Sequence, residues 1–242
     1  MFYVDGKYNR AKIFAEKLDE ATIGQIINLC NQPFVKGSKI RIMPDAHKGA
    51  GCTIGFTADL GDKVVPNLVG VDIGCGMYTV NLGNRYIDLA SLDNFIHKYI
   101  PYGFNSHNRV REHFKELDNL ICLDKIDKGN YFDKQIGTLG GGNHFIEIDE
   151  DDEGDKYLVI HSGSRNLGKM VADYYQDMAI EDCKPYDFSE EREKLIQGLK
   201  DRGKSKEISK ALRVFDAKFK NTQPLYPKDL CFLTGEHREE YL

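Results

Sequence analysis

The spacing of hydrophobic positions changes several times along this chain, and each change predicts a different element. In residues 16–31, leucines and isoleucines recur at helical spacing and form a broad apolar face, which predicts a helix. Residues 89–99 and 169–180 carry the same kind of pattern. Residues 189–220 are rich in charge, and the pattern predicts two solvated helices that are broken near Gly203.

Shorter runs between these helices predict strands. Residues 39–43 alternate between polar and apolar side chains, and Pro44 is expected to end that strand and to lead into a polar loop. Buried strands are predicted over residues 51–58, 68–71, 77–82 and 157–160.

The connection between residues 68–71 and 77–82 is rich in glycine and carries an acid and a thiol. Asp72 ends an apolar run, and Cys75 follows between two glycines. A carboxylate and a thiolate this close can bind one metal ion, or two adjacent ions that share the sulfur. Imidazole and thiolate ligands suit Zn²⁺, whereas imidazole and carboxylate also suit Mn²⁺ or Fe²⁺, so ligand types alone favour zinc. A turn-capping Asp beside an inert Cys is the ordinary alternative.

A histidine segment near residue 144 offers a further ligand. His144 follows a run of three glycines, which costs backbone entropy and which close approach of a phosphate or sugar would explain. A lone histidine on an apolar face is more commonly a core residue. Strand-like alternation from here predicts Asn143, Phe145 and Glu147 on one face, and His144, Ile146 and Ile148 on the other.

A second histidine, His161, ends the predicted strand 157–160 and opens a polar loop. The hydroxyls of Ser162 and Ser164, the backbone amides and Arg165 can hold a phosphate there, with the next helix directing its N-terminus to the same place. An ordinary polar turn is the alternative. A turn is also the alternative for the loop that carries Asp45, His47 and Lys48, which is a weaker phosphate or RNA candidate. Four histidines without such a setting are expected at the surface or in packing: His97, His107, His113 and His237.

Composition narrows the class of protein. The net charge of −5 argues against binding nucleic acid by bulk electrostatics, although it does not exclude a local basic patch. No apolar run approaches the ~20 residues of a membrane span, and the N-terminus lacks the pattern of a signal peptide. The six cysteines are scattered, so reduced thiols in a cytoplasmic protein are expected rather than disulfides.

Four motifs, taken together and in this order, resemble the RtcB family. They are PDAHKG at 44–49, GVDIGCGM at 70–77, GTLGGGNHFIE at 137–147 and HSGSRNLG at 161–168. The resemblance implies an α+β fold in which packed β-sheets and helices surround a buried dinuclear metal cleft, with residues 1–242 forming a single domain. It also implies a GTP-dependent RNA ligase that joins 3′-phosphate or 2′,3′-cyclic phosphate ends to 5′-hydroxyl ends in tRNA splicing or RNA repair.

The same resemblance assigns roles to individual residues. Asp72 would bind one of two Mn²⁺ ions, Cys75 would bridge both and take part in catalysis, and His144 and His161 would each bind one ion. The GTP contacts would come from Asn143, His144, Phe145, Ile146 and Glu147. The implied partners are RNA, as tRNA halves or broken ends, GTP and an archease-type activating protein, with no membrane.

One departure from the family affects the reaction. In the family, the histidine that becomes guanylylated lies in a C-terminal half to which no residue here corresponds, and His237 matches no nucleophile motif. The chain is therefore expected to be incomplete at its C-terminus and inactive alone. Two other functions stay open: a two-metal phosphoesterase that activates water, and a non-catalytic, metal-stabilised RNA-binding module.

Overall fold

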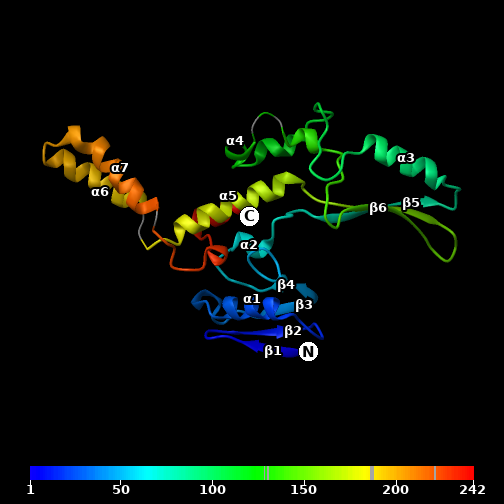
Figure 1. Ribbon diagram of the computed structural model, residues 1–242, viewed down its shortest axis with the longest axis horizontal. Coiled ribbons are helices and arrows are strands. Elements are labelled where there is room, and N and C mark those ends of the chain that lie inside the picture. Colours follow the sequence, from blue (N-terminus) through cyan, green and yellow to red (C-terminus); the bar gives the residue numbers. More distant parts are fainter. Residues whose placement is uncertain (128, 130, 186–187, 221) are drawn as a thin grey trace. The chain divides into compact units, whose positions relative to one another are not determined.

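The computed structural model describes residues 1–127, 129, 131–185, 188–220 and 222–242 and divides the chain into two units (Figure 1). One unit comprises residues 1–69 and 175–242, and the other comprises residues 70–174. The chain combines small β-sheets with helices, which confirms the α+β class. In the described part of the chain, no helix has both the length and the apolar character needed to cross a bilayer.

The first unit contains a four-stranded sheet with the order β1-β2-β3-β4. Its strands are β1 (Phe2–Asp5), β2 (Arg10–Ile13), β3 (Ile40–His47) and β4 (Ile54–Thr57), of which only β2 and β3 are parallel. Helix α1 (Glu20–Cys30) connects that parallel pair and packs on the sheet. The core between them is apolar and includes the fully buried Ile13, Ile26, Leu29, Ile40 and Ile42.

Helix α1 begins later than the apolar pattern predicted. The carboxylate of Asp19 accepts a hydrogen bond from the Thr22 amide at 2.8 Å and caps the helix, so the first helical residue is Glu20. The predicted helix over residues 16–31 is confirmed in its main part.

Two strand predictions in this unit were wrong. Pro44 does not end β3, because the pairing with β4 shifts register between Ile42 and His47, and such an irregularity tolerates a proline. Residues predicted as the strand 68–71 instead contribute to the short helix α2 (Pro66–Val69). Proline suits the first turn of a helix, and an apolar run this short shows no periodicity that separates helix from strand.

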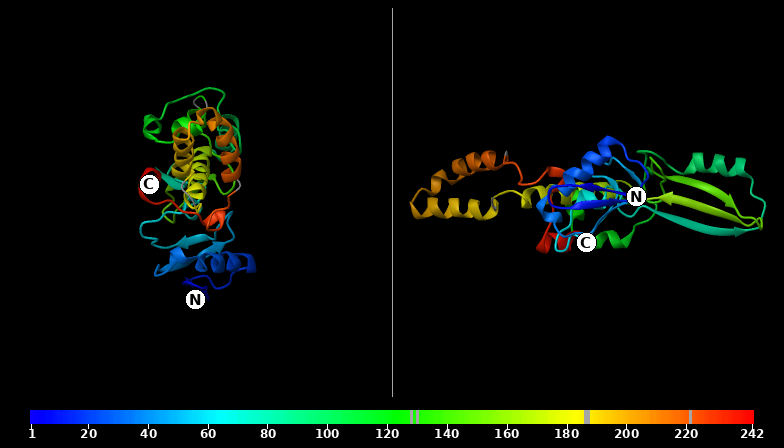
Figure 2. Two further views of the ribbon diagram at one scale, coloured as in Figure 1. Left: turned by 90° about the vertical axis from the view of Figure 1, so that its left-hand side faces the viewer. Right: turned by 90° about the horizontal axis from the view of Figure 1, so that it is seen from below.

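The first unit also contains three helices from the C-terminal part of the chain. Helices α6 (Phe188–Asp201) and α7 (Ile208–Lys220) pack side by side as a hairpin, which confirms the predicted pair broken near Gly203 (Figure 2). Helix α8 (Gly235–Tyr241) ends the chain. Helix α5 (Asn166–Asp182) contains the boundary between the units. Single 3₁₀ turns are η1 (Pro33–Val35), η4 (Ser205–Glu207) and η5 (Lys228–Leu230).

The second unit is built on an antiparallel sheet with the order β5-β7-β6, visible in the right view of Figure 2. The strands are β5 (Gly76–Gly83), β6 (Phe145–Glu150) and β7 (Lys156–Ser162). The predicted strands over 77–82 and 157–160 are confirmed, but β7 runs two residues further, so His161 lies within the strand rather than after it.

Helix α3 (Leu89–Tyr99) has the predicted bounds, because the Asp88 carboxylate caps it by accepting from the Ser91 amide at 3.1 Å. Between α3 and β6, the residues that the structure describes form short helical turns: η2 (Lys115–Asn119), α4 (Leu123–Ile126) and η3 (Asp133–Gln135). Turns of three to five residues leave no periodic signal, and the sequence pattern did not predict them.

A histidine between two carboxylates ties these turns together. Nδ1 of His113 lies 2.7 Å from Oδ2 of Asp133, whose side chain is buried, and Nε2 lies 3.1 Å from Oδ2 of Asp118. Oδ1 of Asp133 accepts from the Phe114 amide at 3.3 Å. The hydrogen bond to Asp133, and then that to Asp118, raises the pKa of His113 above its ordinary value of 6.5. His113, which was expected at the surface or in packing, therefore makes ionic contacts with Asp133 and Asp118.

This contact makes a pH-dependent contribution to stability. Because the folded state raises the pKa of His113, the contribution is full below the unfolded value and is lost as the pH rises through the folded value. We expect the difference in melting temperature between the wild type and His113→Gln to be largest at about pH 6 and to shrink by about pH 9. Thermal denaturation across this range measures it, and a constant difference would contradict it.

Candidate metal centre

The pairing of β5 with β7 brings Cys75 next to His161. Gly76 pairs with Ser162 and Met77 pairs with His161, so Cys75 lies at the end of β5 that adjoins the histidine. Its sulfur lies 2.9 Å from Nε2 of His161. The Cys75 amide donates to the carbonyl of Asp72 at 3.1 Å, which closes a tight turn and keeps both side chains near β7.

His144 approaches the same sulfur from the start of β6. Its Nδ1 lies 3.0 Å from the Leu139 carbonyl, and because a carbonyl only accepts, Nδ1 carries the proton of the neutral ring. Nε2 is the ring nitrogen that faces the other donors, and it lies 2.9 Å from Oδ2 of Asp72 and 3.9 Å from Sγ of Cys75. A backbone carbonyl that fixes the tautomer in this way is typical of metal-binding histidines.

These donors fit a metal ion. Among the residues that the structure describes, Cys75, His144 and His161 are the group whose ligand atoms all lie within 4.8 Å of one another. Asp72 lies outside that group but contacts His144. The sulfur therefore lies between the two imidazoles, with the carboxylate beside His144. The thiolate, imidazole and carboxylate ligands suit a transition-metal ion.

Asp72 reaches the centre only because residue 163 is a glycine. A Cβ at Gly163 would overlap the carboxylate of Asp72. Asp72 and Cys75 are themselves exposed in this chain, whereas the side chain of His144 is 4% exposed. The described residues thus hold the donors without enclosing them.

Partial desolvation, together with the Asp72 carboxylate, raises the pKa of the Cys75 thiol above its ordinary value. In the metal-free chain the thiol is therefore protonated near neutral pH. A cation that binds here displaces that proton.

Arg165 is held in a strained conformation beside the centre. Its φ of 58° is the one positive value outside glycine in the described part of the chain, and such strain is concentrated at functional sites. Its Nε donates to Oγ1 of Thr138 at 3.0 Å, and one Nη donates to the Gly103 carbonyl at 2.9 Å. A Cβ at Gly140 would overlap both this guanidinium and the His144 ring, which explains a glycine there without invoking a ligand.

The polar loop predicted to hold a phosphate already has partners within the protein. The Ser162 hydroxyl donates to the Leu139 carbonyl at 2.9 Å, and the Asn166 amide at the start of α5 donates to Oε1 of Gln135 at 3.1 Å. Oγ of Ser164 is buried and has no hydrogen-bond partner among the described residues. Ser164 is thus the hydroxyl in this loop whose hydrogen-bonding capacity the described residues leave unused.

The strand face predicted for His144 was wrong. The alternation placed it with Ile146, but His144 precedes β6, and its ring contacts that of His161, as does the ring of Phe145. Ile146 pairs with Ile160 and lines a separate cavity. Of the predicted GTP contacts, Asn143 and His144 therefore precede β6, while Phe145, Ile146 and Glu147 lie on it.

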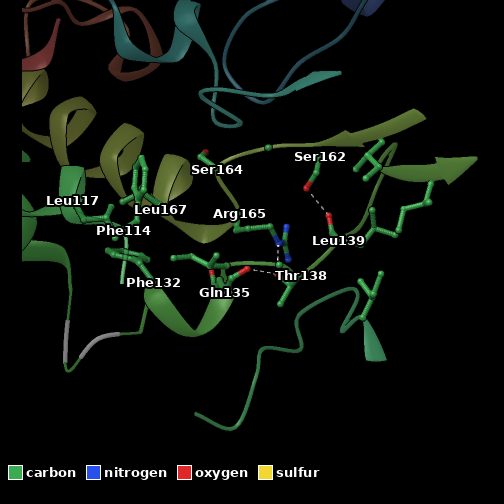
Figure 3. A pocket seen from close by; sticks show the side chains of 16 residues that line it. Phe114, Leu117, Phe132, Gln135, Thr138, Leu139, Ser162, Ser164, Arg165 and Leu167 are labelled. Carbon is green, nitrogen blue, oxygen red and sulfur yellow. Dashed lines mark hydrogen bonds between the residues drawn. The ribbon is translucent and has the colours of Figure 1, made fainter. Parts of the chain in front are cut away.

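A largely apolar cavity of ≈ 530 Å³ is lined in part by the loop that carries Arg165 (Figure 3). Phe114, Leu117, Phe132 and Leu167 line one part of it, and Arg165 with Thr138 lines another. Sequence reasoning missed Leu139, which contacts His144, and Thr138 and Gln135, which accept from Arg165 and from the Asn166 amide. A single carbonyl, hydroxyl or amide leaves no pattern in a sequence.

Asp45, His47 and Lys48 belong to the other unit. Asp45 and His47 lie on β3 and Lys48 follows it, and Nδ1 of His47 contacts the Asp45 carbonyl at 2.8 Å. Their role in binding phosphate or RNA stays a prediction.

A family model described as tRNA-splicing ligase RtcB matches residues 25–128 and 121–213. The chain belongs to the RtcB family. The first matched range contains Asp72 and Cys75, and the second contains His144, His161 and Arg165. The residues that converge in space thus all lie within the part that defines membership of the RtcB family.

Curated relatives carry the same family name. The RNA-splicing ligase RtcB of Escherichia coli strain K12 is 33% identical over 178 residues, which cover 64% of this chain and 43% of the relative. The tRNA-splicing ligase RtcB of Thermococcus kodakarensis is 27% identical over 69% of this chain and 46% of its own length. That of Methanococcus maripaludis is 30% identical over 72% of this chain and 48% of its own length. The chain therefore spans less than half the length of these RtcB relatives.

The central position of Cys75 leads to a prediction about metal content. After loading with Mn²⁺ and removal of free metal, Cys75→Ala is expected to lose all bound ions together, because its sulfur lies between both imidazoles. His97→Ala is the matched control, since His97 is an exposed histidine of the same unit that pairs with Asp93. Metal analysis that finds full occupancy in Cys75→Ala would refute this assignment.

Proposed function

We propose that the protein to which these residues belong is a GTP-dependent RNA ligase. It joins RNA ends that carry a 3′-phosphate or 2′,3′-cyclic phosphate to 5′-hydroxyl ends, in tRNA splicing or RNA repair. The observation that carries the proposal is the convergence of Asp72, Cys75, His144 and His161 from three separate segments within the ranges matched by the family model.

Two Mn²⁺ ions are the proposed cofactors. Asp72 and His144 would hold one ion, His161 would hold the other, and Cys75 would serve as a ligand to both. Its sulfur lies 3.9 Å from Nε2 of His144 and 2.9 Å from Nε2 of His161. Bound metal ions of this kind offset the negative charge of crowded phosphates and activate oxygen nucleophiles. The zinc that ligand types alone favoured is an alternative that metal analysis decides.

The chain's own residues would bind and orient the substrates. The Leu139 carbonyl contacts Nδ1 of His144 and so directs Nε2 toward a ligand. Arg165 uses Nε and one Nη within the protein, and its other Nη would contact a phosphate. Asn143, Phe145, Ile146 and Glu147 are the proposed contacts to GTP. Ser162, Ser164 and the β3 residues Asp45, His47 and Lys48 are proposed contacts to phosphate or RNA.

The remaining elements of the proposal follow from family membership. Residues 1–242 would form one RtcB-like domain whose metal cleft is buried in the complete enzyme, in the cytoplasm, with an archease-type protein as activator. Guanylate would first be transferred to a histidine that corresponds to no residue of this sequence. The histidine nitrogen would attack the α-phosphate of GTP and release pyrophosphate. The RNA 3′-phosphate would then take the GMP and free the histidine, and the 5′-hydroxyl would displace GMP to form the phosphodiester.

Arg165 provides a test of phosphate binding. Hydrogen bonds to charged groups contribute roughly 1.5–3 kcal/mol, so Arg165→Ala is expected to weaken binding of GTP or of RNA 3′-phosphate ends by about ten- to a hundredfold. Because the substitution also removes bonds to Thr138 and Gly103, Arg165→Lys is the companion, since it keeps the charge and loses the planar fork. Unchanged affinity of Arg165→Ala for both ligands, in titrations of the folded variants, would exclude a phosphate role.

Guanylylation tests the reaction. With α-labelled GTP and Mn²⁺, the 242-residue chain is expected to carry no label on a denaturing gel, because it lacks the family's nucleophilic histidine. The natural protein that contains this chain is expected to become labelled with GTP and not with ATP, and to seal 3′-phosphate to 5′-hydroxyl RNA. Label on the short chain would show that the nucleophile is misplaced. Metal-dependent release of phosphate without label or ligation would favour a phosphoesterase, and RNA binding without any reaction would favour a binding module.

A further inference from the structure

Residues 97–111 form a basic segment near the metal centre, and no role in binding metal or GTP described above uses it. The segment contains Lys98, Arg109, Arg111 and two histidines but no acidic residue, in a chain with 38 Asp and Glu and a net charge of −5. It begins in the last turn of α3 and continues as irregular chain in the same unit as the metal donors.

The two arginines of this segment have no acidic partner among the described residues. No ion pair or hydrogen bond of the side chains of Arg109 and Arg111 is found among the described residues, and both are exposed. Lys98 lies 5.0 Å above the ring of Tyr99, and His97 pairs with Asp93 on α3. His97 and Lys98 lie in the last turn of α3, where basic side chains interact favourably with the helix dipole. The two arginines lie beyond the helix, so the dipole does not explain their presence.

Aromatic side chains are interleaved with these cations. Phe104 is fully exposed at 103%, Tyr102 is 56% exposed and Tyr99 is 45% exposed. Tyr99, Tyr102, Lys98 and Arg111 line a polar hollow of ≈ 380 Å³ together with Asn105 and His107. Flat exposed rings beside unpaired guanidinium groups match what a single-stranded nucleic acid offers, because every nucleotide carries both a base face and a phosphate.

Backbone hydrogen bonds connect this surface directly to the metal centre. The Gly103 amide donates to the Gly140 carbonyl at 2.6 Å, and the Leu139 amide donates to the Pro101 carbonyl at 2.9 Å. The Leu139 carbonyl faces His144, and the Gly103 carbonyl accepts from Arg165. Phe104 is therefore one residue from a group that holds Arg165, and the segment is fixed to the same loop that positions a proposed ligand.

We propose that residues 97–111 are a binding surface for single-stranded RNA that leads an RNA end to the metal centre. Arg109 and Arg111 contact phosphates, while Phe104 and Tyr102 stack on bases. The proposal rests on the proposed ligase function for its substrate, but its binding step requires neither GTP nor reaction.

The test measures binding of the intact protein to a fluorescent single-stranded RNA with hydroxyl groups at both ends, which cannot be ligated, over a series of salt concentrations. For Arg109→Gln/Arg111→Gln we expect the slope of log affinity against log salt to fall by about 1.4, because each phosphate that an arginine neutralises on a single strand contributes ~0.7 to that slope. For Phe104→Ala we expect roughly tenfold weaker binding with the slope unchanged, because stacking releases no counterions.

Arg85→Gln and Tyr86→Ala are the matched controls. Both residues are exposed, belong to the same unit and follow the end of β5 that is remote from Cys75. We expect them to bind as the wild type does. Equal losses of RNA binding in these controls would overturn the proposal. So would wild-type RNA binding by both the double arginine variant and Phe104→Ala, provided that both variants melt as the wild type does. The latter result would point to a protein segment as the cover of these rings.

Ligation of 3′-phosphate RNA, measured on the same variants, separates this inference from the proposed function. If the wild type ligates and the segment variants bind and ligate equally well, the surface is wrong and the ligase stands. If the natural protein does not ligate but its RNA binding depends on Arg109, Arg111 and Phe104, the surface stands and the ligase fails.

Discussion

The antiparallel pairing of β5 with β7 is the constraint on which the metal centre depends. Cys75 and His161 lie 86 residues apart in sequence, and the register that pairs Gly76 with Ser162 brings their donor atoms to 2.9 Å. Because side chains alternate across a strand, a slip of one residue would turn His161 to the opposite face. The same strand pairs with β6, which follows His144 directly, so β7 aligns both imidazoles with one sulfur.

Backbone groups, rather than a shell of charged side chains, hold this centre in shape. The Leu139 carbonyl contacts Nδ1 of His144, and the Gly103 carbonyl accepts a hydrogen bond from the guanidinium group of Arg165. Glycines at 140 and 163 let the charged groups pass close to the chain. Fixed dipoles of this kind cost little rearrangement when a charged ligand binds, which is what a site for phosphates and cations requires.

Net charge is a poor guide to what this protein can bind. The chain carries a charge of −5, yet residues 97–111 contain no acid and present two arginines without ion pairs among the described residues. Within a Debye length of roughly 8 Å at physiological salt, a phosphate responds to the nearby guanidinium groups and much less to distant carboxylates. Local arrangement therefore decides what a surface can bind more than the total charge does.

The sequence by itself determined the elements that have a clear period or a capping residue, and it determined the chemical types at the centre. Helix α3, with Asp88 as its cap, and strand β5 were predictable because their signals are local. Only the tertiary structure decided the rest. The four-residue helix α2 has no period to read, and β3 passes Pro44 because its partner strand shifts register. The orientation of His144 depends on the carbonyl of Leu139 in the preceding loop. The contact between Cys75 and His161 joins segments 86 residues apart, and such contacts leave no mark in a local pattern.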